Sequence, residues 1–295
     1  MVNLEDLLNN NPPDGQRNQP LPKEEYAAKK QAEREEIFKL SDNTAMEVAA
    51  NGGKFQQYLD VQAKFDRYSA VNALLIMAQK PESTIIGSFE HWKYKDAFVK
   101  SGQTAFSILE PHEYINEDGS TRTGYNIKKM FDISQVDARR VKAAPIPYHS
   151  SSQILKALIK EAPAKITCVD ELPGGFGAVT NHGTGEISVR KGMEYADIFR
   201  CLAKELAGIN LAAGNNVQSD IHFSAYCAAY ILCKKYGVDT HNFDFTNARV
   251  VFDNMDAQTI KRELSRIRDT AHAISGRMAK QLDAPQKAAR AQEVR

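Results

Sequence analysis

The sequence lacks the features that define several large classes of proteins. It has four cysteines in 295 residues and no CxxC pair, which excludes a small fold held together by disulfides. No stretch approaches the roughly 20 apolar residues that span a bilayer. The first residues, MVNLEDLLNN, lack the basic start and apolar run of a secretory signal. We therefore expect a cytoplasmic protein with free thiols and no membrane partner. The cysteines are Cys168, Cys201, Cys227 and Cys233.

The sequence also has almost no net charge. Its 38 Lys and Arg residues balance 37 Asp and Glu residues, which gives a formal charge of +1 at pH 7. A protein with this balance does not coat nucleic acid over its whole surface. Any nucleic-acid site must therefore be a local patch.

The apolar pattern predicts an α+β fold, with strands followed by helices rather than strict alternation. The N-terminal residues hold too few large apolar side chains to form a core. Ser41 is the predicted N-cap of the helix with which the first compact unit begins, and Asn51-Gly52-Gly53 is the predicted end of that helix. Pro145 and Pro147 mark a predicted linker. The predicted segments are a flexible tail and helix over 1–40, a first domain over 41–148, a linker over 144–152, a second domain over 149–282 and a disordered tail over 283–295. Strands are predicted at 83–87, 104–109, 124–133, 165–170, 177–181 and 186–190, and second-domain helices at 152–161, 195–213, 219–235, 245–254 and 256–282.

Basic and aromatic side chains are interleaved between residues 54 and 100. Cations can follow the phosphates of a single strand, and flat rings can stack on unpaired bases for roughly 1–3 kcal/mol each. Composition alone leaves the alternative open that these rings belong to the core, and nearby carboxylates dilute the patch. The residues concerned are Lys54, Lys64, Arg67, Lys93, Lys95 and Lys100 with Tyr58, Phe65, Tyr68, Phe89, Trp92 and Tyr94.

The string YSAVNALLIMAQKPESTIIGSFEHWKYKDAFVKSGQTAFSILEP, residues 68–111, adds information that composition lacks. Together with MFDISQ at 130–135, it resembles the N-terminal single-stranded-DNA-binding domain of ArdC-type antirestriction proteins, which conjugative elements encode. One turn departs from the family pattern: VKSGQTAF stands where KKGEKGI is usual, so Lys100 and Gly102 are kept while a charged pair and a glycine are lost.

The resemblance implies that Tyr68, Ser69 and Asn72 lie near the strand-binding face, with Phe89 and Trp92 beside them. In this hypothesis bases stack on Trp92, Phe89 or Tyr68, and Asn72 and Ser69 donate hydrogen bonds. Phosphates are expected to be bound by Lys64, Arg67, Lys93, Lys95 and Lys100.

The resemblance also implies a second, zincin-like metallopeptidase domain. The segment CLAKELAGINL stands where a zinc peptidase has HExxH, with two His ligands on one helix face and a Glu as general base. Lys204 and Gly208 occupy the two ligand positions, and Tyr226 stands where relatives have the third ligand, a glutamate. Only Glu205 is retained. We therefore predict a pseudo-metallopeptidase with no catalytic residue, metal or cofactor.

Other residues offer weaker alternatives for chemistry in the second domain. His182, His222 and Asp220 could ligate a metal, but their spacing is not that of a known site. Three cysteines fall in apolar helical contexts, where an inert buried thiol is expected. The glycine-rich loop at 173–177 predicts a tight turn rather than a phosphate site. Residues 256–295 carry nine basic and five acidic residues, so the outer face of the last helix could extend a DNA path.

The predicted function is non-specific binding of single-stranded DNA by a non-enzymatic antirestriction protein of a mobile genetic element. A restriction enzyme or another host protein is a further expected partner. Two alternatives remain open: an active zinc metallopeptidase with unrecognised ligands, and a protein-interaction module that does not bind DNA.

Overall fold

The structure is a computed structural model that describes residues 22–116, 118–137, 139, 149–214 and 220–293. Residues 1–21 of the predicted tail and most of the predicted linker over 144–152 lie outside the described residues, as do the last two residues of the predicted disordered tail. The chain divides into two compact units, residues 1–39 and residues 40–295. None of the described helices is long and apolar enough to cross a membrane.

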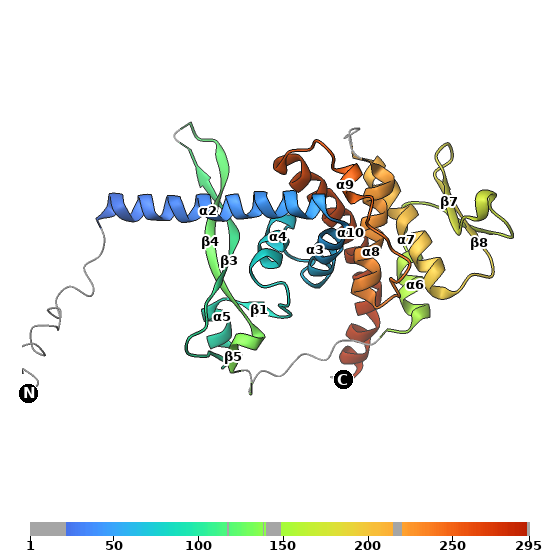
Figure 1. The fold of residues 1–295 in the computed structure, drawn as a ribbon. Helices are drawn as coiled ribbons and strands as arrows, with labels where there is room; N and C mark the ends of the chain where they lie inside the picture. Colours follow the sequence, from blue (N-terminus) through green and yellow to red (C-terminus); the bar gives the residue numbers. More distant parts are fainter. Residues whose placement is uncertain (1–21, 117, 138, 140–148, 215–219, 294–295) are drawn as a thin grey trace, which may run out of the picture. The chain divides into compact units, whose positions relative to one another are not determined.

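Helix α2, Lys23–Ala50, begins in the first unit and ends in the second (Figure 1). In its first part the side chains are mostly exposed and joined by local contacts, such as the hydrogen bond of 2.8 Å from Gln31 to Glu35. The prediction that Ser41 is an N-cap is wrong, because the helix runs through this residue and buries it completely. The predicted stop at Asn51 is confirmed: its side chain accepts a hydrogen bond from the backbone of Lys54 and caps the next helix.

The N-terminal half of the second unit combines three helices with small antiparallel sheets. One sheet has the order β1-β4-β3, and a separate pair joins β2 to β5. Strands β3 and β4 pair without interruption from Phe106 opposite Met130 to Ile115 opposite Thr121. The elements are α3 (Gly52–Lys64), α4 (Ala70–Gln79), β1 (Ile86–Gly87), α5 (Phe89–Tyr94), β2 (Phe98–Val99), β3 (Phe106–Ile115), β4 (Thr121–Asp132), the short 3-10 turn η1 (Ile133–Gln135) and β5 (Val136–Asp137).

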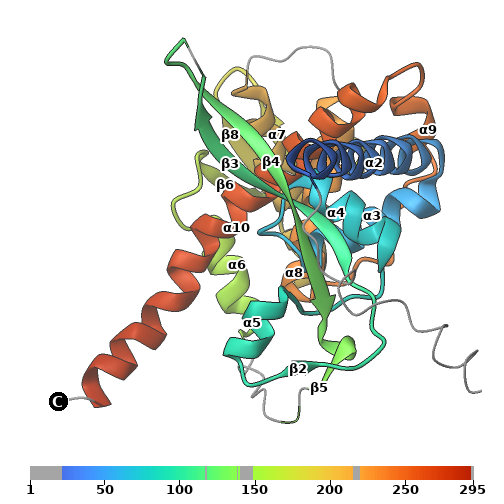
Figure 2. The same cartoon turned by 90° about the vertical axis from the view of Figure 1, so that its left-hand side faces the viewer.

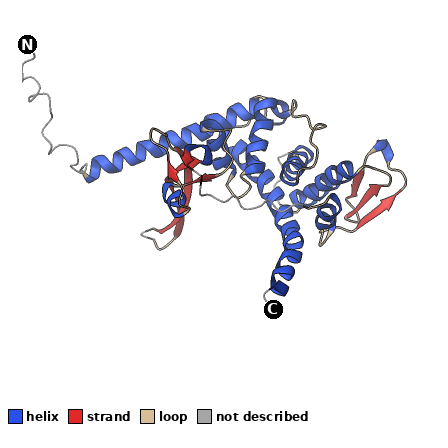
Figure 3. Ribbon diagram, turned by 90° about the horizontal axis from the view of Figure 1, so that it is seen from below, coloured by secondary structure: helices blue, strands red, loops and turns tan. Residues whose placement is uncertain are grey.

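The C-terminal half has one small sheet and a set of long helices. In this sheet β6 runs parallel and β7 antiparallel to the central strand β8. Figure 3 shows helices lying between the two regions of strands. The elements are α6 (Ser151–Ile159), β6 (Ile166–Val169), η2 (Pro173–Gly175), β7 (Ala178–Asn181), β8 (Glu186–Arg190), α7 (Tyr195–Ala212), α8 (Ile221–Tyr236), α9 (Ala248–Val251) and α10 (Ala257–Glu293). The predicted α+β class is confirmed.

A continuous apolar core joins α3 and α4 to the C-terminal helices. The ring of Phe55 lies 5.4 Å from that of Phe223, 5.7 Å from Phe245 and 5.5 Å from Phe252, measured between centroids. At the start of α3, Gly52 lies so close to Phe245 that an added Cβ would stand 2.5 Å from its carbonyl oxygen. Residues from both predicted domains thus share one core, and the division near residue 148 stays a prediction.

Candidate functional site

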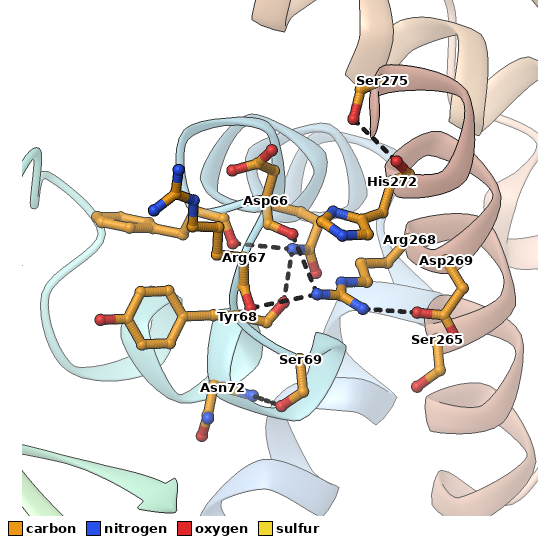
Figure 4. Close-up of polar contacts among 12 residues, drawn as sticks. Asp66, Arg67, Tyr68, Ser69, Asn72, Ser265, Arg268, Asp269, His272 and Ser275 are labelled. Carbon is orange, nitrogen blue, oxygen red and sulfur yellow. Dashed lines mark hydrogen bonds and ion pairs between the residues drawn. The ribbon is translucent and has the colours of Figure 1, made fainter. Parts of the chain in front are cut away.

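The loop between α3 and α4 is held from inside by two side chains. Gln62 is fully buried and donates to the carbonyl oxygens of Phe65 and Tyr68, at 3.2 and 3.3 Å. The guanidinium of Arg268 on α10 donates to the carbonyl oxygens of Asp66 and Arg67, both at 3.2 Å (Figure 4). The side chains of Arg67 in this loop and of Lys64 at the end of α3 are both exposed.

Tyr68 and Ser69 follow this loop at the start of α4. Tyr68 is half-buried, with its ring edge-on to Phe65 at 6.0 Å; burial raises its pKa, and the nearby ammonium of Lys128 opposes this rise. Ser69 is exposed, and its hydroxyl accepts a hydrogen bond of 3.2 Å from the backbone of Asn72. Ser69 is therefore the N-cap of α4.

The structure corrects the role expected for Asn72. Its side chain is 6% exposed, and its amide nitrogen donates to the carbonyl oxygen of Leu109 on β3 at 2.8 Å. Its amide oxygen accepts from the backbone nitrogen of the same residue, also at 2.8 Å. The Asn72 amide therefore fastens α4 to β3 rather than facing a DNA strand.

The structure also corrects the role expected for Trp92. The side chain is 1% exposed and packs with Ala97 and Val136 in a small second core. Its indole nitrogen donates to the carbonyl oxygen of Phe131 at 3.0 Å. A base therefore cannot stack on this ring. Trp92 belongs to the core, which is the alternative that composition left open. The same holds for Tyr58 and Phe65, which are also buried.

The segment around Trp92 nevertheless presents other rings to solvent. Phe89 is 51% exposed, Tyr94 89% and Phe98 55%. The sequence analysis names Tyr94 among the interleaved rings but does not assign it to the site, and it misses Phe98, although the position of both beside lysines in HWKYKDAFVK was a signal. Three exposed lysines lie in the same α5–β2 segment: Lys93, Lys95 and Lys100.

An open polar groove of about 520 Å³ lies next to this segment. The turn of VKSGQTAF forms much of its wall, and Gly102 makes that turn with a φ of +77°. The groove therefore lies at the turn where the sequence departs from the family pattern. Its lining residues are Gln79, Lys80, Gly102, Gln103, Thr104, Ala105, Phe106 and Gln135.

The positions expected to have lost metal ligands make contacts within the fold. The phenol of Tyr226 accepts a hydrogen bond of 2.8 Å from the backbone of Asp244, and its ring packs tilted against that of Phe243, with the centroids 4.7 Å apart. Lys204 is partly exposed, and its ammonium lies 3.8 Å from the carboxylate of Glu205. At Gly208 an added Cβ would meet only the Cβ of Ala225, at 4.0 Å.

Glu205 itself is engaged by the neighbouring sheet. One carboxylate oxygen accepts hydrogen bonds from both the backbone nitrogen and the hydroxyl of Thr180 on β7, at 3.0 and 2.7 Å. The side chain is 17% exposed, and Thr180 is buried. The carboxylate therefore fastens α7 to strand β7.

The described residues contain no group of three or more His, Cys, Asp or Glu side chains that could hold a metal. Asp220 caps α8 by accepting from the backbone of Phe223 at 3.0 Å, and His182 and His222 are exposed. Burial raises the pKa of Cys201 and Cys227, and raises that of Cys233 to about 12, so these thiols stay protonated near neutral pH.

The last helix uses several of its basic residues within the fold. Lys261 pairs with Asp42 of α2, and Arg266 lies 3.0 Å from Glu263. Arg277 donates to the carbonyl oxygens at the end of α6, including that of Leu158 at 2.8 Å. With Arg268 held by the α3–α4 loop, these cations contribute to packing rather than to an open DNA path.

Comparison with known proteins agrees with this fold. Residues 35–143 match the family model of the N-terminal domain of anti-restriction factor ArdC. The metal-free crystal structure of the antirestriction protein ArdC from plasmid R388 is similar in fold, with 16% identity, a TM-score of 0.50, and 72% of this chain and 86% of that chain covered. Its Mn(II)-bound structure gives 15% identity, a TM-score of 0.48, and coverage of 73% and 85%. No curated protein sequence matches.

Residues 35–143 are therefore similar to the N-terminal domain of anti-restriction factor ArdC, and the chain as a whole has an α+β fold. This match agrees with the resemblance to ArdC-type proteins that residues 68–111 carry.

Proposed function

We propose that this ArdC-type protein binds single-stranded DNA without sequence specificity, and that its contact surface centres on α5 and β2. The observation that carries this proposal is the exposure of Phe89, Tyr94 and Phe98 beside three exposed lysines. Exposed rings provide stacking surfaces that tolerate any base, while the ammonium groups follow the phosphates. In this proposal Tyr94 and Phe98 take the place of Trp92.

The charge of this surface sets the expected strength of binding. Lys93, Lys95 and Lys100 share the segment with Glu90 and Asp96, so the local excess of positive charge is small. If the three lysines each neutralise one phosphate, the logarithm of the affinity should fall with the logarithm of salt concentration with a slope of about −2. A slope of this size distinguishes a local patch from a polycation.

The proposal includes a C-terminal half without peptidase activity. A lysine at the first ligand position repels Zn²⁺ unless it is deprotonated, and a glycine at the second supplies no ligand atom. The carboxylate of Glu205 accepts hydrogen bonds from the backbone and the hydroxyl of Thr180. The C-terminal half then acts as the scaffold on which α3 and α4 pack.

Within a cell, such a protein would act in antirestriction for a mobile genetic element. It would cover DNA that enters as a single strand, or contact a restriction enzyme or another host protein while its own DNA is bound. Both roles require sequence-independent binding to single-stranded DNA, and this binding is the property to test first.

Fluorescence anisotropy with a labelled single-stranded oligonucleotide, and with the matching duplex, tests the proposal. We expect salt-dependent binding that prefers the single strand, and a loss of affinity of about tenfold or more in Lys93→Glu/Lys95→Glu. The matched control is Lys165→Glu/Lys191→Glu, two exposed lysines that flank the β6–β8 sheet. Absence of binding by the wild type, or an equal loss in the control, contradicts the proposal.

A further inference from the structure

The β3–β4 hairpin extends well beyond the part of it that packs on the core. Strand β1 pairs with β4 only at Phe131 and Asp132, near the base of the hairpin. Residues 106–109 are buried, whereas residues 110–115 on β3 are exposed. Figure 2 shows the two strands as a long twisted ribbon whose hairpin end projects past α3 and α4. This outer part offers two open faces.

The register assigns each side chain of the ribbon to one of these faces. On the first face His112 lies opposite Gly124, and Tyr114 lies opposite Arg122. An added Cβ at Gly124 would stand 2.7 Å from the His112 ring and 3.2 Å from the Tyr114 ring. Both rings therefore lie across the glycine, with centroids 6.0 Å apart. We call these four residues the ribbon face.

The ribbon face is continuous with the surface proposed to bind DNA. Lys128 belongs to the same side of β4, four residues along the strand from Gly124 toward the core. Its ammonium acts on Tyr68, whose pKa is raised by burial and lowered by Lys128, and on Glu90 of α5, whose pKa is lowered by its own backbone, by Ser88 and by Lys128. The ammonium of Lys128 also pairs with Glu110 of β3, on the same side of the ribbon as the ribbon face.

The second face of the ribbon has a different chemistry. It carries Tyr125 opposite Pro111, Glu113 opposite Thr123, and Ile115 opposite Thr121. Its outer part has the carboxylate of Glu113 and an exposed isoleucine but no cation, whereas the carboxylate on the first face, that of Glu110, is paired with Lys128. Only the first face combines exposed rings with a guanidinium.

We propose that the ribbon face is a second contact surface for single-stranded nucleic acid, on which Tyr114 and His112 stack on bases and Arg122 contacts phosphate. This inference rests on the proposed function, because it extends the strand path from α5 past Lys128 to the hairpin. Gly124 is needed there because any side chain would displace both rings. A strand that is long enough contacts α5 and the ribbon together, and a short strand contacts one of them.

Anisotropy titrations with oligothymidines of two lengths, about 8 and about 25 nucleotides, test the inference. The variants are Tyr114→Ala, Arg122→Glu and, as matched control, Tyr125→Ala. Tyr114 and Tyr125 lie on one hairpin with similar exposure, 44% and 40%, but on opposite faces. We expect Tyr114→Ala and Arg122→Glu to weaken binding of the long oligonucleotide about fivefold to tenfold, with Tyr125→Ala close to wild type. A photoreactive 5-iodouracil in the long oligonucleotide should crosslink to Tyr114 or His112.

The outcomes separate this inference from the proposed function. If the long oligonucleotide binds and Lys93→Glu/Lys95→Glu weakens it, while Tyr114→Ala and Arg122→Glu do not, the ribbon inference is overturned and the proposed function stands. An equal loss in Tyr125→Ala overturns the assignment to one face. If the wild type binds neither oligonucleotide, both the inference and the proposed function fail. Circular dichroism of each variant excludes unfolding as the cause of a loss.

Discussion

Asn72 holds both backbone groups of Leu109, with its amide nitrogen and amide oxygen each 2.8 Å from their partner atoms. Gln79, two helical turns further along α4, makes the same double contact with Ser107 at 2.8 and 2.9 Å. Residues seven apart share a helix face, and residues two apart share a strand edge. The two amides therefore cover the edge of β3 where a neighbouring strand could otherwise add.

Removal of the Asn72 amide should destabilise the protein. In Asn72→Ala the buried N–H and C=O of Leu109 lose their partners, which we expect to cost about 2–4 kcal/mol in the free energy of unfolding. Urea denaturation followed by circular dichroism measures this cost. Asn126→Ala, an exposed asparagine of β4, should stay within about 0.5 kcal/mol of wild type. Unchanged stability in Asn72→Ala, with weaker DNA binding, would instead support the original assignment to the DNA surface.

Two adjacent glycines test how tightly α3 packs on the C-terminal half. In Gly52→Ala the new Cβ would stand 2.5 Å from the carbonyl oxygen of Phe245, a backbone atom that cannot move alone. We expect a loss of about 1–3 kcal/mol. In Gly53→Ala the nearest atom is the Asn51 side chain at 3.2 Å, and the gain in helix propensity should leave stability near wild type. Equal effects of the two changes in chemical denaturation would contradict this packing.

Much of the secondary structure was predictable because local patterns dictate it. Strand β8 matches its predicted bounds, and α7 and α8 differ from theirs by at most two residues, since apolar spacing is a local signal. Ser41 was mispredicted because a good capping residue can also be buried inside a longer helix, where tertiary packing outweighs the capping preference.

The site was less predictable because its residues depend on distant partners. The partner of Asn72 is 37 residues away, and nothing in YSAVNALLI indicates that the amide faces β3. The composition of the α5 segment shows that rings and lysines occur together, but not which of the rings is buried. In the structure Trp92 is buried and Tyr94 is exposed. The ribbon face requires the register of β3 with β4, which residue types alone do not give.

Glu205 should matter for stability rather than for catalysis. Loss of its two hydrogen bonds from Thr180 in Glu205→Ala should cost about 1.5–3 kcal/mol, since bonds to a charged group are the stronger kind. Glu186→Ala, which removes an exposed partner of Lys165, should cost less than about 1 kcal/mol. Thermal denaturation of both variants measures the difference. A Glu205→Ala variant that is as stable as wild type but loses a peptidase activity would point to a catalytic base.

The buried thiol of Cys233 should make stability fall at alkaline pH. Burial raises its pKa to about 12, with Arg200 opposing the rise. Between pH 9 and 12 the unfolded chain releases this proton while the folded chain keeps it, so the unfolded state gains stability as pH rises. The thiol should contribute a fall of about 1 kcal/mol per pH unit in this range. Urea titrations at pH 8, 9 and 10 measure the slope, which should be shallower in Cys233→Ala; equal slopes would contradict the assignment.

The metal content of the purified protein tests directly whether the C-terminal half lacks a zinc site. Lys204 and Gly208 are four residues apart on α7 and cannot supply HExxH ligands, so protein purified without added metal should contain far less than one zinc per chain by elemental analysis. A chelator should leave its melting temperature unchanged. In Lys204→His/Gly208→His two imidazoles would share one helix face with room at position 208, and we expect zinc binding to appear. Because Glu205 remains bonded to Thr180, we expect no peptidase activity in that variant. Stoichiometric zinc in the wild-type protein would show that other residues ligate the metal.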